Sequence, residues 1–135
     1  MAGDSGTPLG KKLGLKDGAV GYLVNVPDEL RPVFAGLDVR ARLPASCGYI
    51  HLFETDASRF VAAMPRLARA LADDGLLWVS WPKKASKRPT TVDEHMVRSV
   101  GLDTGLVDVK VCAVDEVWSG LKFVRRLRDR KKRSG

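Results

Sequence analysis

Residues 75–88 read GLLWVSWPKKASKR, an apolar run that ends at a proline and then breaks into cations. A short, continuous apolar run closed by a turn signal is typical of a strand buried on both faces of a sheet. In an open parallel α/β sheet, ligands bind at the carboxyl ends of such strands. We therefore expect a binding site for a negatively charged group here, formed by Trp81, Lys83, Lys84, Lys87 and Arg88.

The segments around this strand alternate between strand and helix patterns. Strand patterns cover residues 19–26, 37–42 and 48–54, and helix patterns cover residues 7–14, 27–35, 56–72 and 89–100. Two alternating segments, 107–115 and 121–126, flank Trp118-Ser119-Gly120 and predict an antiparallel hairpin. The order predicts an α/β fold: a three-layer, Rossmann-like, mostly parallel sheet with an antiparallel C-terminal hairpin.

Three local signals refine the predicted helices. Pro65 either kinks the helix that begins near Asp56 or opens a second short helix. Thr91 and Glu94 have the spacing of a capping box at the start of the next helix. Gly101 is expected to end that helix.

The net charge of +7 is concentrated at the C-terminus. Residues 122–135 hold eight Lys or Arg and one acidic residue, whereas the other 121 residues balance at 15 basic and 15 acidic. We predict a flexible N-terminus at 1–6, a single domain at 7–126 and a flexible basic tail at 127–135. Such a tail is either a solvated end or a salt-sensitive contact for an anionic surface.

Several classes of site are not supported by the residue pattern. The chain has no long apolar segment, so we predict a cytoplasmic protein with no membrane partner. Cys47 and Cys112 have no metal-like spacing to each other or to His51 and His95, and we expect free thiols and no metal. No GxSxG or GxxxxGK[ST] motif occurs. We expect no catalytic residue and no cofactor, and the sequence leaves the oligomeric state open.

The order of elements resembles a shortened class I methyltransferase, and ALADDGLLWV at residues 70–79 looks like the helix-to-strand turn of that superfamily. A closer resemblance rests on three blocks. They are SGTPLGKKLGLKDG at 5–18, WPKK at 81–84 and VCAVDEVWSGLKFVRR at 111–126. Together they resemble a family of small uncharacterised bacterial proteins, which implies the fold and no established activity.

The chain departs from the methyltransferase pattern where a cofactor would bind. An S-adenosylmethionine site uses a glycine-rich turn after the first strand, because only glycine lets the backbone approach the ligand closely. Here the first strand runs into Asn25-Val26-Pro27-Asp28-Glu29, with no glycine. Arg40 and Arg42 follow the second strand, where an acidic residue would hold ribose hydroxyls.

These observations favour a non-catalytic or degenerate methyltransferase-like domain that binds an anionic small molecule or partner near the WPKK loop. One alternative is an enzyme that uses the same pocket with Asp115 or Glu116 as acid–base groups beside Trp118. A second alternative is nucleic-acid binding through the basic loop and the tail. Each candidate also has a purely structural interpretation. Asp115 and Glu116 would then lie at the tip of a hairpin, and the lysines of the WPKK loop would lie on a solvated surface turn.

Overall fold

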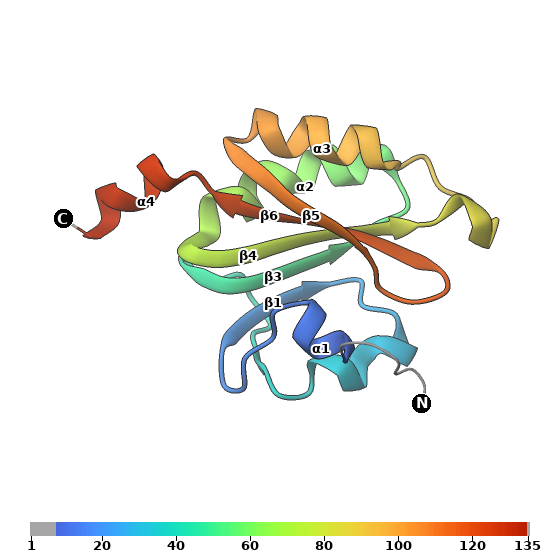
Figure 1. The fold of residues 1–135 in the computed structure, drawn as a ribbon, viewed down its shortest axis with the longest axis horizontal. Helices are drawn as coiled ribbons and strands as arrows, with labels where there is room; N and C mark the ends of the chain where they lie inside the picture. Colours follow the sequence, from blue (N-terminus) through green and yellow to red (C-terminus); the bar gives the residue numbers. More distant parts are fainter. Residues whose placement is uncertain (1–7, 135) are drawn as a thin grey trace.

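The structure, a computed structural model, describes residues 8–134 and has a six-stranded sheet with strand order β2-β1-β3-β4-β6-β5 (Figure 1). The strands are β1 (Val20–Val24), β2 (Asp38–Val39), β3 (Cys47–Phe53), β4 (Leu71–Pro82), β5 (Leu106–Ala113) and β6 (Trp118–Arg125). The α-helices are α1 (Leu9–Lys12), α2 (Ala57–Ala70), α3 (Glu94–Asp103) and α4 (Leu127–Ser134), and the 3-10 helices are η1 (Asp28–Phe34) and η2 (Lys84–Ser86).

The sheet is mostly parallel, as its alternating pattern predicts. Strands β2, β1, β3 and β4 run in one direction, whereas β6 pairs antiparallel with both β4 and β5. The chain leaves β1 toward β2 on one side and leaves β3 toward β4 on the other. The topological switch point of the sheet is therefore the gap between β1 and β3.

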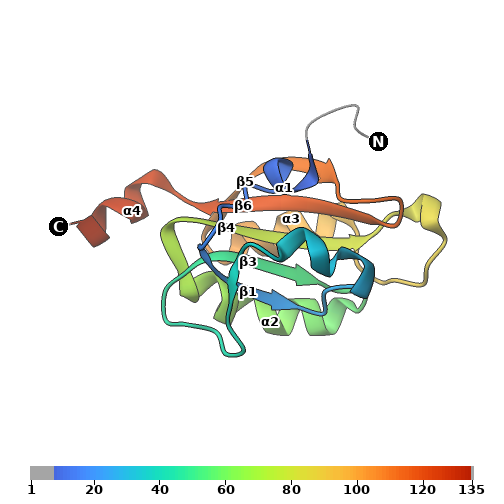
Figure 2. The ribbon, with the colours of Figure 1, turned by 90° about the horizontal axis from the view of Figure 1, so that it is seen from below.

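The helices form one layer on each face of the sheet. Helices α2 and α3 cover one face together, and α1 and η1 lie on the other (Figures 1 and 2). The first face packs aliphatic side chains of the central strands against Phe60 and Met64 of α2. The second face is richer in aromatic rings, with Tyr49, Phe53 and Trp78 beneath the short helices.

The prediction of a mixed sheet with an antiparallel C-terminal hairpin is confirmed, but several local boundaries differ. Helix α2 runs through Pro65 without ending there. Asp93, not Thr91, caps α3, because its carboxylate accepts a hydrogen bond from the Met96 amide at 2.9 Å. Helix α3 continues past Gly101, which packs closely on the ring of Phe123.

The two ends of the chain differ in what the structure describes. The predicted flexible N-terminus at 1–6 lies outside the described residues. Helix α4 occupies most of the segment predicted as a basic tail and extends from the end of β6 (Figure 1). The predicted turn Trp118-Ser119-Gly120 is instead the first part of β6, so the hairpin loop covers only residues 114–117. Within residues 8–134, no helix is both long enough and apolar enough to cross a bilayer.

Candidate ligand-binding site

Strand β4 carries the apolar run of residues 75–88 through the middle of the sheet and delivers its last residues to the carboxyl edge. Trp81 and Pro82 pair with Ser119 and Trp118 of β6, and both are buried. After them the chain turns through η2, and Lys87 takes a left-handed conformation with φ of 59°. The expected strand end and basic loop therefore lie together at the edge where ligands of α/β sheets bind.

A pocket of about 500 Å³ opens beside this strand end. One wall comes from Trp81, Pro82 and Lys84, and the other comes from residues 90–95 at the start of α3. Its volume lies within the range of small-molecule sites. Of the predicted site residues, Trp81 and Lys84 are among those that line it.

The charged groups of this pocket are unequally engaged. Asp93 caps α3, and Glu94 forms an ion pair with Arg98 at 3.0 Å. Lys84 and His95 also line the pocket, but within the described residues their side chains make no hydrogen bond or ion pair. The acids are thus occupied, and the groups left for a ligand are a cation and an imidazole.

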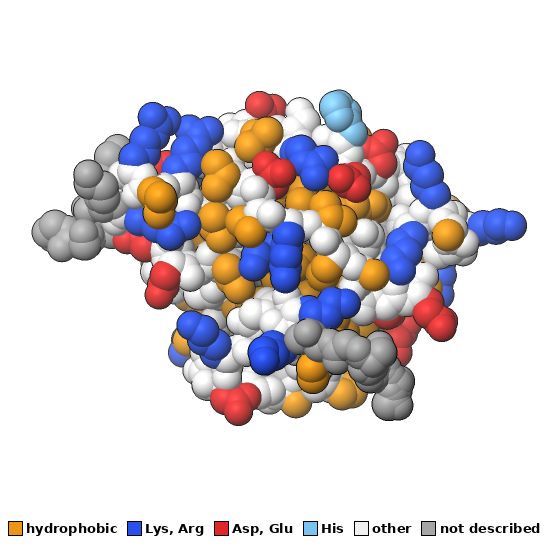
Figure 3. All heavy atoms as spheres, in the orientation of Figure 1, with side chains coloured by type: hydrophobic (Ala, Val, Ile, Leu, Met, Phe, Trp, Pro, Cys, Tyr) orange, Lys and Arg blue, Asp and Glu red, His pale blue; other side chains and the backbone are white. Residues whose placement is uncertain are grey.

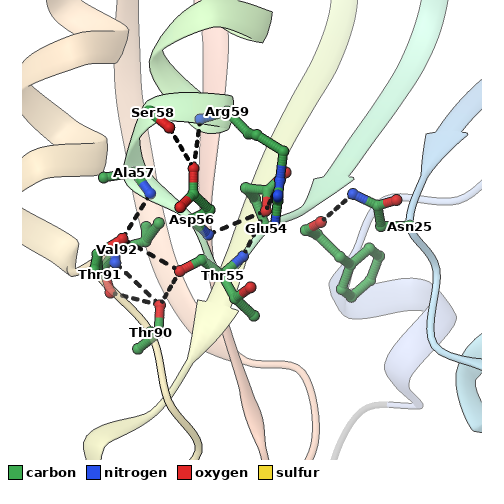
Figure 4. A network of polar contacts seen from close by, with 11 residues as sticks. Asn25, Glu54, Thr55, Asp56, Ala57, Ser58, Arg59, Thr90, Thr91 and Val92 are labelled. Atoms are coloured by element: carbon green, nitrogen blue, oxygen red, sulfur yellow. Dashed lines mark hydrogen bonds and ion pairs between the residues drawn. The ribbon is translucent and has the colours of Figure 1, made fainter.

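A network of hydrogen bonds holds the far wall of the pocket to the start of α2 (Figure 4). The carbonyl of Thr55 accepts the Thr90 hydroxyl and the Thr91 amide, both at 2.9 Å. The Thr91 hydroxyl accepts the Ala57 amide at 2.7 Å, and the Thr90 hydroxyl accepts the Val92 amide at 3.0 Å. The loop between β4 and α3 is therefore tied to the body of the protein at its second half.

Glu54 directly follows β3 and supports the same corner of the structure. Its side chain is only 6% exposed, and its Oε2 accepts the amides of Thr55 and Asp56 at 2.9 and 3.0 Å. Arg59 of α2 adds an ion pair at 3.3 Å (Figure 4). This carboxylate thus holds the entrance of α2 in place, a role that the strand pattern at 48–54 did not reveal.

The other predicted cations of the WPKK loop lie elsewhere. The Lys83 ammonium donates to the carbonyl of Asp115 at 2.6 Å, so it joins the loop to the β5–β6 turn. Lys87 and Arg88 are exposed and do not line the pocket. The structure therefore divides the predicted group: Lys84 lines the pocket, Lys83 braces it, and Lys87 and Arg88 extend into solvent from the same loop.

The secondary candidates Asp115, Glu116 and Trp118 belong to the hairpin turn. The Asp115 carboxylate accepts the amides of Val117 and Trp118 at 2.8 and 2.7 Å, which is the geometry of an Asx turn. Trp118 is buried edge-on against Phe53 with centroids 5.3 Å apart. Glu116 is exposed and lies outside the pocket. The acid–base alternative needs a carboxylate that is available to a substrate. The Asp115 carboxylate instead holds the backbone of the hairpin turn.

The gap between β1 and β3 is where the fold would hold a nucleotide-like cofactor. Asn25 follows β1 in a left-handed conformation with φ of 59°, and its side-chain amide donates to the carbonyl of Phe53 at 3.1 Å (Figure 4). Glycine at such a turn leaves backbone open to a ligand, whereas this side chain bridges the two strand ends. Pro27 removes one amide donor, and a 3-10 helix follows it.

The end of β2 also lacks the group that would hold a ribose. Arg40 follows this strand and pairs with Asp38 at 3.0 Å, which lowers the carboxyl pKa of Asp38 through that hydrogen bond. The residues present at both strand ends therefore do not fit S-adenosylmethionine. Within residues 8–134, no group of three His, Cys, Asp or Glu side chains is arranged to hold a metal ion.

One buried polar chain was not foreseen from the sequence. The Tyr49 hydroxyl lies 3.0 Å from Nδ1 of His51, and Nε2 of His51 lies 2.8 Å from the Ser80 hydroxyl. The imidazole stacks on Phe53 with centroids 4.2 Å apart and is fully buried, which lowers the pKa of His51 to about 3. A neutral, enclosed imidazole has a structural role here, because no substrate reaches it through the protein interior.

No protein-family description and no curated protein matches this chain by sequence. Its structure resembles a SAM-dependent methyltransferase from Aquifex aeolicus with a TM-score of 0.58 and 17% identity, covering 84% of this chain and 85% of that one. It also resembles magnesium protoporphyrin IX methyltransferase from Synechocystis PCC 6803, solved with bound SAH, with a TM-score of 0.57 and 12% identity, covering 84% of this chain and 76% of that one. A third similar structure is precorrin-6y C5,15-methyltransferase from Geobacter metallireducens GS-15, with a TM-score of 0.57 and 9% identity, covering 87% of this chain and 86% of that one.

These likenesses establish a methyltransferase-like fold. At such low identities they concern the path of the backbone and not the side chains of a site. The resemblance to a shortened class I methyltransferase is thus confirmed at the level of the fold. The function has to be argued from the residues themselves.

Proposed function

We propose that this chain is a methyltransferase-fold domain that binds a small anionic ligand and does not transfer methyl groups. The observation that carries the proposal is the unequal use of charge in the pocket beside β4. Its two acids are engaged within the protein, whereas Lys84 and His95 have no partner among the described residues. A ligand phosphate or carboxylate would supply that partner.

Trp81 and Pro82 give the pocket an apolar floor next to the cation. A small anion with an attached ring or aliphatic part fits such a combination, because the apolar part buries surface while the charge meets Lys84. Lys87 and Arg88 extend from the same loop and would add longer-range attraction to the anion. The hydrogen bond from the Thr90 hydroxyl to the Thr55 carbonyl holds the opposite wall of the pocket in place. Less conformational entropy is therefore lost when a ligand binds.

The residues at the β1–β3 gap support the part of the proposal that concerns methyl transfer. Asn25 ties the two strand ends together where the cofactor's backbone cradle would lie. Opening that gap would break the bond to the Phe53 carbonyl and would still leave Pro27 without an amide to offer. Both features support a domain that keeps the fold and does not bind S-adenosylmethionine.

Thermal denaturation with added probes tests both parts of the proposal. Pyrophosphate and ADP are the anionic probes, and S-adenosylmethionine is the cofactor probe. An anionic probe at about one hundred times its Kd stabilises the protein by about 2.7 kcal/mol, which raises Tm by roughly 5–10 °C. We expect this rise with at least one anionic probe and none with S-adenosylmethionine.

Lys84→Ala should remove the probe-induced rise and leave the ligand-free Tm unchanged, because Lys84 is exposed and its side chain makes no hydrogen bond or ion pair with the described residues. Lys16→Ala, an exposed lysine outside this pocket, is the matched control and should keep the full rise. An unchanged rise in the Lys84 variant would place the anion elsewhere. Stabilisation by S-adenosylmethionine would refute the interpretation of the β1–β3 gap.

A further inference from the structure

Three lysines meet on the part of the sheet that α1 and η1 leave uncovered. Lys110 of β5 and Lys122 of β6 are directly opposite each other in the antiparallel pairing. Lys12 of α1 reaches the same place, with its ammonium 3.4 Å from the carbonyl of Ala113 on β5. We call Lys12, Lys110 and Lys122 the lysine patch.

The patch holds positive charge without compensation. None of the five ion pairs among the described residues involves these lysines, and Asp108 of β5 is engaged by Arg98. Figure 3 shows Lys and Arg side chains among hydrophobic ones on the β5–β6 side of the molecule, with acidic side chains nearer α3 and the rim. Like charges placed directly opposite on neighbouring strands destabilise a sheet.

The chain also fixes the position of this charge. The Lys122 ammonium lies 5.9 Å from the centre of the Trp78 ring, a cation–π distance, and the indole N–H of Trp78 is held by the Leu13 carbonyl at 2.9 Å. Partial burial and the charge of Lys110 both lower the pKa of Lys122. Costly, positioned and unpaired cations are the arrangement expected at a binding site for an anion.

The shape of the surface indicates what kind of anion it would bind. The pockets beside Trp81, Leu43, Gly48 and Val33 are lined by other residues, so the patch belongs to none of these four and lies on the strand pair β5–β6. Trp78 beneath the patch is fully buried, so no aromatic ring is offered for stacking with bases. Lysines on a flat strand surface match repeated phosphates and read no base edges.

The cations continue along one direction. Strand β6 runs from the patch into Arg126, about 13 Å beyond Lys122 at strand spacing, and α4 then carries Arg128 and Arg130. A line of cations suits a linear polyanion better than a compact one. A lipid surface would need an apolar anchor beside the charge, and Val109, next to Lys110, is 49% exposed. Binding to anionic vesicles is therefore measured beside DNA binding.

We infer that the lysine patch is a sequence-independent contact surface for the phosphate backbone of duplex nucleic acid. This surface is separate from the pocket beside β4 and from the WPKK loop. Each lysine neutralises one phosphate and releases its counterions. The slope of log K against log salt therefore changes by about 0.9 for each lysine removed.

Fluorescence anisotropy with a short, mixed-sequence DNA duplex, measured between about 50 and 200 mM salt, tests this surface. The wild-type protein should bind with micromolar or weaker affinity and with no preference among sequences. Lys12→Gln/Lys110→Gln/Lys122→Gln should make the salt slope shallower by about 2.7. Because the comparison uses a difference in slope, any contribution from the basic C-terminus cancels.

The matched control is Lys16→Gln/Arg42→Gln/Arg66→Gln, which removes the same net charge from exposed positions outside the patch and outside the pocket beside β4. Its slope should change by less than 1. Equal changes in the two triple variants would show a general charge effect and overturn the inference. The inference is also overturned if the patch variant binds DNA as the wild type does. A parallel measurement uses vesicles containing phosphatidylserine, and the inference is overturned if the patch variant loses affinity for these vesicles alone. A melting curve of each variant confirms that it is folded.

Discussion

The two faces of the sheet are built from different materials. The face under α2 and α3 is filled mostly by aliphatic side chains, with the rings of Phe60, Trp81 and Phe123 among them, and two helices of 14 and 10 residues cover it. The face under α1 and η1 carries aromatic rings, a buried Tyr49–His51–Ser80 chain and, at its uncovered part, the lysine patch. The difference suggests that the first face supplies most of the stability, whereas the second face holds the polar groups that respond to pH, salt and ligands.

The largest expected effect comes from the aliphatic face. Phe60→Ala removes a fully buried ring from α2 and leaves a cavity against β3 and β4, at a cost of about 3–5 kcal/mol. Urea denaturation measures this as a lower midpoint. Val61→Ala, at a neighbouring position that is 48% exposed, should change the stability by less than about 0.5 kcal/mol. A loss for Phe60→Ala no larger than that of the polar variant below would remove the contrast between the faces.

The second effect comes from the buried polar chain. Ser80→Ala leaves Nε2 of His51 without its partner at 2.8 Å, and an unsatisfied buried group costs about 1–3 kcal/mol. Ser99→Ala on the exposed side of α3 is the control and should be neutral. Amide hydrogen exchange would then show faster opening of β3 and β4 in the Ser80 variant alone. A neutral Ser80→Ala would mean that the chain contributes nothing to stability.

The pH dependence of stability provides a third test of the same chain. Burial lowers the pKa of His51 to about 3, whereas an unfolded histidine has a pKa near 6.5. As the pH falls below about 6.5, His51 binds a proton in the unfolded chain but stays neutral in the folded protein. The free energy of unfolding therefore decreases, by up to about 1.4 kcal/mol per pH unit, until the pH approaches 3.

Urea midpoints measured between pH 7 and 5 check this slope, because the carboxyl groups with lowered pKa values titrate at lower pH. His95→Gln should keep the slope, since His95 is exposed. A flat stability profile across this interval would mean that His51 becomes protonated inside the folded protein. The aliphatic face has no titratable group of this kind, so the response belongs to the aromatic face.

The fold was largely predictable because its signals are local. The apolar run before Pro82 identified β4, and the alternation after Gly105 identified the hairpin. The predicted cap of α3 was wrong. The Thr91 hydroxyl accepts a hydrogen bond from the Ala57 amide, and Asp93 caps the helix instead. A local pattern cannot register that competition.

The candidate site was only partly predictable for a related reason. The strand end with Trp81 and Lys84 follows from chain order, and it remains a prediction until a ligand is tested. The separate role of Lys83 depends on the β5–β6 turn, and the Asn25 bridge depends on the position of Phe53 in a strand 28 residues away. The Lys110–Lys122 pair depends on a register shift between Asp108 and Lys110 that no alternation of residues reveals.

The smallest effect concerns the lysine patch and has the opposite sign from the others. Lys110→Gln removes a cation that lies directly opposite Lys122, so at low salt the variant should be more stable than the wild type by about 0.2–1 kcal/mol. The gain should fade at high salt, because the repulsion is screened. Thermal denaturation at two salt concentrations measures it, and Lys87→Gln, exposed on the WPKK loop, should show no gain.

A variant that gains stability while losing DNA affinity separates the two uses of this face. Residues kept for packing destabilise the protein when they are changed, whereas residues kept for binding often stabilise it when they are removed. Destabilisation by Lys110→Gln would mean that the patch contributes to the fold, and the aromatic face would then resemble the aliphatic one in its function. A gain would show that the uncovered part of the sheet carries a cost that only a bound anion offsets.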